Sequence, residues 1–81
     1  MHVDEVKGLI EKGFPDAEVF VKGEGDHFEA IVISASFEGE SRDRQHQRVY
    51  PSLGDLMQAE IQALALFTYT PDQWAAQRRV Q

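Results

Sequence analysis

The sequence predicts one small α+β domain in which a three-stranded sheet has helices packed on one face. Three observations carry this prediction. An apolar stripe with helical spacing opens the chain, two strand-like stretches follow, and a helix-start motif comes directly after a third apolar run. The predicted order is α-β-β-α-α-β-α. A helix layer on one face of the sheet is the economical way for such elements to bury their apolar sides.

The size and composition of the chain limit what it can be. Its 81 residues make a single domain, 1–81, with a modest core. The absence of cysteine excludes a disulfide framework, a thiolate nucleophile and a cysteine metal site within this chain. The start, Met-His-Val-Asp-Glu, lacks the basic and apolar regions of a signal peptide, and the longest apolar runs are too short to span a bilayer. We therefore expect a cytoplasmic protein.

The first helix is predicted from an apolar stripe that repeats at helical spacing over about ten residues. It should end at Lys12-Gly13, because Gly suits the left-handed position after a helix and Pro15 cannot continue it. The stripe consists of Val3, Val6, Ile10 and Phe14, with Leu9 beside it.

Two strands joined by a Gly-rich loop are predicted next. Residues 17–22 alternate, with Ala17, Val19 and Val21 on one face and Glu18, Phe20 and Lys22 on the other. The loop Gly23–Asp26 has turn chemistry and leads into a second strand, His27–Ile33. This strand ends with apolar residues on both faces, which predicts cover on both sides there.

The Arg-rich segment that follows is predicted to form two short helices. Ser41 is the candidate N-cap of the first helix. Pro51 should break it, because proline has no N–H for the helical hydrogen bond. A core-facing set at helical spacing runs across the break and consists of Val49, Leu53, Leu56 and Met57.

A third strand is predicted at Ala63–Tyr69, and the last helix begins directly after it. Thr70 at the N-cap, Pro71 at the first helical position and Gln73 two residues further on form a capping box. Trp74 is the expected anchor of this helix.

No pattern in the sequence predicts catalysis. There is no G-x-S-x-G motif, and the Gly-rich loop lies between two strands, so it is a turn and not a phosphate cradle. The histidines, His2, His27 and His46, match no metal-ligand spacing, and singly such residues are more often surface or structural. We expect a protein that is not an enzyme.

The charge is unevenly distributed. Residues 1–41 carry three Lys and ten acids, which gives −7, whereas residues 42–81 carry five Arg and four acids, which gives +1, so the net charge is −6. A nucleic-acid-binding domain usually has a basic surface. Only the cluster of Arg42, Arg44 and Arg48 offers one here, and the alternative interpretation of this cluster is a solvated helix face.

Several stretches, taken together, resemble the BolA-like proteins. They are DHFEAIVIS at 26–34, FEG at 37–39, RQHQRVY at 44–50, Ala63-Leu64 and TPDQW at 70–74. The resemblance covers nearly the whole chain and is closest to the short bacterial branch. It implies a fold similar to a type II KH domain. The G-x-x-G loop with which KH domains clamp RNA is absent, because no two glycines stand three residues apart.

The resemblance implies a non-catalytic adaptor that pairs with a monothiol glutaredoxin in iron–sulfur cluster assembly or trafficking and in iron regulation. In that pairing a [2Fe–2S] cluster is shared with glutaredoxin and glutathione, and the isolated chain holds none. His27 matches the ligand of the hairpin region. The second family ligand, a His before the third strand, is Gln62 here, and an amide is a poor ligand for iron.

Three outcomes of this replacement stay open. His46 takes the place of the missing ligand, the cluster binds weakly through one protein ligand, or the two proteins pair without a cluster. We expect the chain alone to be a monomer or a weak dimer, with no membrane partner.

Two alternatives to the adaptor role also stay open. One is a DNA-binding transcriptional regulator that uses the helix-turn-helix-like segment 41–61 with Arg42, Arg44 and Arg48. The other is an interaction module whose exposed Phe67 or Tyr69 forms an unrelated interface.

Overall fold

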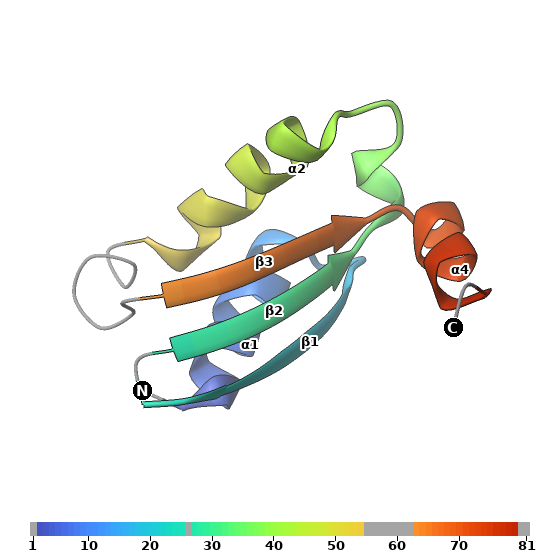
Figure 1. Ribbon diagram of the computed structural model, residues 1–81. Coiled ribbons are helices and arrows are strands. Elements are labelled where there is room, and N and C mark those ends of the chain that lie inside the picture. The colour runs from blue at the N-terminus through green and yellow to red at the C-terminus, as the bar shows by residue number, and fades with distance from the viewer. Residues whose placement is uncertain (1, 26, 55–62, 80–81) are drawn as a thin grey trace.

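The protein is described here by a computed structural model that covers residues 2–25, 27–54 and 63–79. The helices are α1 (Val3–Gly13), α2 (Arg42–Val49) and α4 (Pro71–Arg79), the strands are β1 (Glu18–Glu24), β2 (His27–Ile33) and β3 (Ala63–Tyr69), and two 3-10 turns are η1 (Ala35–Phe37) and η2 (Tyr50–Leu53) (Figure 1). The strands predicted at 27–33 and 63–69 are confirmed with the same ends, and the strand expected over 17–22 is β1. None of the described helices is long and apolar enough to cross a membrane.

The break predicted at Pro51 is present. α2 ends at Val49, and the chain continues as the 3-10 turn η2, in which Leu53 is buried. Leu56 and Met57, the other predicted core residues of this segment, lie outside the described residues.

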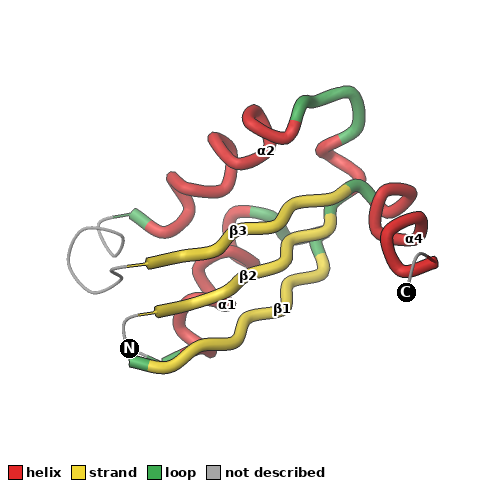
Figure 2. Tube along the Cα trace, viewed as in Figure 1, coloured by secondary structure: helices red, strands yellow, loops and turns green. Residues whose placement is uncertain are grey.

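The sheet has the order β1-β2-β3 and is mixed. β1 runs antiparallel to β2, whereas β3 runs parallel to β2. The register places Val19 opposite Val32, and Val32 opposite Thr68, so one face of all three strands faces the core. α1 covers this face and α2 lies beside β3, as the trace in Figure 2 shows.

The core lies between this face and the helices α1 and α2. The rings of Phe14 and Phe37 pack against each other with centroids 5.4 Å apart, and Phe37 is completely buried. The predicted stripe of the first helix is confirmed, since its central residues contact the core. The buried cluster contains Val6, Ile10, Phe14, Val19, Phe28, Ala30, Val32, Phe37, Val49, Leu53 and Leu66.

α4 packs differently from the other two helices. Its Trp74 ring lies 6.3 Å from Phe20 and 5.3 Å from Tyr69, and both of these residues belong to the face opposite α1. The helices α1 and α2 lie on one face of the sheet as predicted. The last helix, α4, instead covers the end of the opposite face. The expected cover on both sides of β2 near its end is confirmed, because Val32 and Ile33 are both buried.

Two predicted helix caps are confirmed by their hydrogen bonds. The Ser41 hydroxyl accepts from the Arg44 N–H at 3.2 Å. At the start of α4, the Gln73 N–H donates to the Thr70 hydroxyl at 3.1 Å, and the Thr70 N–H donates to Oε1 of Gln73 at 2.9 Å. These reciprocal bonds satisfy donors that a helix start otherwise leaves unpaired.

Candidate functional site

His27 is exposed at the first position of the central strand β2. In the sheet it stands opposite Glu24 of β1 and Ala63 of β3. Gln62, which occupies the position of the family's second ligand, comes directly before Ala63 in the sequence and lies outside the described residues. His27, the candidate ligand in the sequence, therefore lies at the end of the sheet where β3 begins.

The turn chemistry before β2 explains why the backbone can place His27 there. A Cβ on Gly23 would stand 2.5 Å from the carbonyl oxygen of His27, so only glycine permits this close approach of the two strands. Gly25 has a φ of +62°, in the left-handed region that favours glycine. The hairpin thus depends on two glycines, and both stand next to the candidate ligand.

An open groove of about 610 Å³ runs along this end of the sheet. Its side chains are acidic, basic and aromatic: Lys22, Glu24, His27, Phe28 and Glu29, with Gly23 and Ala65 between them. The ammonium group of Lys22 lies 3.5 Å from Oε2 of Glu29 in an exposed pair. An exposed pair of this kind contributes little to stability.

The groove offers a metal one accessible imidazole and not a complete site. Among the residues that the structure describes, no three His, Asp or Glu side chains come close enough to hold a metal ion. An iron–sulfur cluster at His27 would need its other ligands from a partner, because cluster iron is held mainly by thiolates.

The other two histidines have different surroundings. His46 lies half-buried on α2, and its Nε2 atom is buried without a hydrogen-bond partner among the described residues. In this conformation that nitrogen is not accessible to a cluster carried by another protein. His2 caps α1, since its Nδ1 accepts from the Asp4 N–H at 3.1 Å.

The predicted arginine cluster divides into residues with separate roles. Arg48 donates to the carbonyl oxygen of Ser36 at 2.8 Å and pairs with Glu40, while its guanidinium lies over the rings of Phe14 and Phe37 at 5.5 and 5.3 Å. It therefore connects α2 to η1 and α1. The sequence does not reveal this structural role, because Glu40 and Arg48 stand eight residues apart and the other partners of Arg48 lie in η1 and at the end of α1.

The remaining arginines of this cluster are exposed on α2. Nε of Arg44 lies 3.8 Å from Oε2 of Glu40, and its side chain is 70% exposed. Arg42 is also exposed and lies beside Tyr69, Gln73 and other residues that line a small groove of about 330 Å³. Glu40 thus neutralises part of the local positive charge, so the surface left for a phosphate group is smaller than the sequence suggested.

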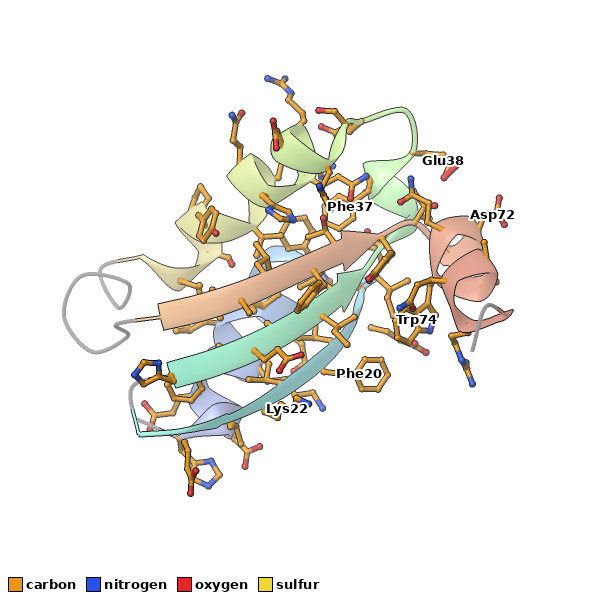
Figure 3. The ribbon with its side chains drawn as sticks, viewed as in Figure 1. Phe20, Lys22, Phe37, Glu38, Asp72 and Trp74 are labelled. Carbon is orange, nitrogen blue, oxygen red and sulfur yellow. The ribbon has the colours of Figure 1, made fainter. Side chains whose placement is uncertain are left out.

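The sheet face opposite α1 carries a group of apolar side chains. Phe20 is 50% exposed and Phe67 is 41% exposed, and both line a groove of about 660 Å³ that also contains Ile31, Tyr69 and Trp74. Figure 3 shows Phe20 and Trp74 on this side of the sheet. The exposure of Phe67 agrees with the predicted interaction surface. The sequence did not assign Phe20 and Trp74 to this surface, because their place on it depends on the pairing of the strands and on the position of α4.

The comparisons with known proteins agree with this fold. The family described as BolA-like protein matches residues 10–73. The chain is 32% identical to "Acid stress protein IbaG" of Escherichia coli (strain K12) over 81 residues, which cover 99% of this chain and 96% of that protein. A solved bolA protein homologue from Coxiella burnetii is 41% identical with a TM-score of 0.82, over 93% of this chain and 97% of that one.

A longer type of relative matches only in part. The "DNA-binding transcriptional regulator BolA" of Haemophilus influenzae is 38% identical over 56 residues, which are 69% of this chain and 54% of that protein. The full-length agreement is thus with the short IbaG-type proteins, and the predicted resemblance is confirmed. From its fold and from these matches, the chain belongs to the BolA-like protein family.

Proposed function

We propose that this BolA-like chain is a non-catalytic cytoplasmic adaptor that pairs with a monothiol glutaredoxin in iron–sulfur cluster assembly or trafficking and in iron regulation. The observation that carries the proposal is the position of His27. Its imidazole is exposed at the end of the central strand, beside the start of β3 and on an open groove that a partner can enter.

His27 fits the role of one ligand to a [2Fe–2S] cluster held jointly with glutaredoxin and glutathione. The cluster, when bound, supplies an electron-accepting and transferable iron unit, and replacing thiolate by imidazole raises its reduction potential. The chain's own part is to present the imidazole from a strand end that is paired on both sides, with Glu24 and with Ala63. The groove carries the carboxylates of Glu24 and Glu29 beside the single ammonium group of Lys22, and this excess of negative charge favours a partner with a basic docking surface.

The test is a titration of the protein into a monothiol glutaredoxin that carries its glutathione-ligated [2Fe–2S] cluster, followed by visible circular dichroism. We expect the cluster spectrum to change on binding and the change to be lost in His27→Ala. His2→Asn is the matched control, because it removes another exposed imidazole but keeps a side chain that can cap α1.

The possible results separate ligation from docking. Binding without a spectral change would contradict the shared cluster and leave a docking adaptor. No complex at micromolar concentration would overturn the adaptor proposal itself. A His27→Ala spectrum that matches the unmodified protein would show that the cluster is ligated by other residues.

A second candidate function is DNA binding, because some relatives carry the name of DNA-binding transcriptional regulators. Arg42 and Arg44 are the exposed cations of segment 41–61 that are suited to it. A duplex-binding assay at low salt should then show an affinity that falls steeply with added salt, and changing both residues to Ala should reduce that slope by about 2. No binding at low salt would count against this function. Arg48 should not be used for this test, since its loss would also disturb the fold.

A further inference from the structure

The outer edge of β1 is a free edge of the sheet. Within the described part of the chain, β1 pairs only with β2, and its backbone makes no hydrogen bond outside that ladder. In Figures 1 and 2, β1 is the outermost strand on one side of the sheet, whereas α2 lies beside β3 on the other. A free strand edge presents N–H and C=O groups that a further strand can pair with.

The side chains of β1 are self-complementary in one antiparallel register. Glu18, Phe20 and Lys22 share the open face of the sheet, and Val19 and Val21 share the core face. If two copies of β1 pair with Phe20 opposite Phe20, Glu18 of each copy stands opposite Lys22 of the other. The two valines pair in the same way. Opposite charges and apolar pairs directly across an antiparallel ladder are stabilising.

Neighbouring registers lack this complementarity. Residues that stand directly opposite each other across a ladder point to the same face of the sheet. The register can therefore shift only by steps that keep the open faces of the two strands on the same side. Pairing about Val21 would put Glu18 opposite Glu24, which is repulsive. Pairing about Val19 would put Glu18 opposite Phe20 and leave Lys22 beyond the start of the partner strand. The register centred on Phe20 is therefore favoured by its charges.

We propose that the β1 edge is an interaction surface for a second copy of this chain, paired antiparallel about Phe20. The two sheets then form one continuous sheet. The half-exposed rings of Phe20 meet across the twofold axis, and each remains packed against Trp74 of its own copy. Lys22 is 78% exposed and within reach of Glu29 of its own copy, so it bridges that carboxylate and Glu18 of the other copy.

Charge-reversal variants of the full chain, followed by sedimentation velocity over a concentration series, test this register. We expect a monomer–dimer equilibrium. Glu18→Lys and Lys22→Glu should each weaken the dimer by at least about tenfold, because each turns both symmetric ion pairs into like-charge pairs. The double variant should regain the unmodified affinity within about threefold, since it restores both pairs in reverse. Glu11→Lys, which makes the same charge change as Glu18→Lys at an exposed site on α1, is the matched control.

Three results would overturn the proposal. The first is a protein that stays monomeric up to about millimolar concentration. The second is a dimer that both single variants leave unchanged. The third is a double variant that dimerises no better than the single ones. Far-UV circular dichroism checks that each variant is folded, and Glu18→Gln and Lys22→Gln, which remove the attraction without adding repulsion, replace any variant that is not.

Discussion

Replacing Arg48 by Ala should destabilise the fold, although arginine on a short surface helix is usually dispensable. The guanidinium donates to the Ser36 carbonyl oxygen at 2.8 Å and to the Ser36 hydroxyl at 3.3 Å, and it pairs with Glu40. It also covers the edge of the core formed by Phe14 and Phe37. One side chain thus connects α2, η1 and α1.

The expected loss in the free energy of unfolding follows from these contacts. A hydrogen bond from a charged donor contributes about 1.5 kcal/mol, and a partly exposed ion pair contributes about 0.5 kcal/mol. Two contacts between the cation and an aromatic ring add about 0.5 kcal/mol each. The side chain of Arg48 is 36% exposed, so we expect Arg48→Ala to lower the free energy of unfolding by about 2–3 kcal/mol. A domain of this length has a total of only about 4–12 kcal/mol.

Urea unfolding monitored by far-UV circular dichroism measures this loss, and the midpoint should fall by roughly 2 M. Arg44→Ala is the control, because its guanidinium is 70% exposed and its distance to Glu40 is 3.8 Å. Its unfolding free energy should change by no more than about 0.5 kcal/mol. Equal losses for Arg44→Ala and Arg48→Ala would refute the structural role of Arg48.

Other substitutions test the helix cap and the glycines. Thr70→Ala should lower the free energy of unfolding by about 1 kcal/mol, because α4 loses the hydroxyl that accepts from the Gln73 N–H; an unchanged urea midpoint would contradict this. Gly8→Ala should raise the free energy of unfolding by about 0.5–1 kcal/mol, because a Cβ there meets no atom within 4 Å and alanine favours the helix. Gly23→Ala should instead lower it by more than about 1 kcal/mol, since the new Cβ would clash with the His27 carbonyl oxygen. Thermal unfolding of the two glycine variants should therefore move in opposite directions.

The features that the sequence predicted well are local. The start of α4 depends on Thr70 and Gln73, which stand three residues apart and bond to each other. The start of β2 at His27 follows from a Gly-rich turn directly before it. Periodicity also identified the core-facing side of α1 and of β1. Such signals need no knowledge of distant parts of the chain, because neighbouring residues alone decide them.

The role of Arg48 could not be read in the same way. As part of an Arg-rich helix it resembles a residue of a phosphate-binding surface, and its position in the sequence groups it with Arg42 and Arg44. In the structure its partners come from η1 and from the end of α1. Only packing of α2 against these elements decides that the guanidinium faces the core edge and not the solvent.

The sequence by itself therefore determined the family, the order of the described helices and strands, and the position of His27 at a strand start. The tertiary structure decided which strands are neighbours and which surfaces they form. Phe20 meets Phe67 and Trp74 on one side of the sheet although a long stretch of chain separates it from both. Alternation assigns each residue to one of two faces of its own strand, but it does not order the strands or place α4. Those choices depend on the burial of the whole sheet, and they leave β1 with its free edge.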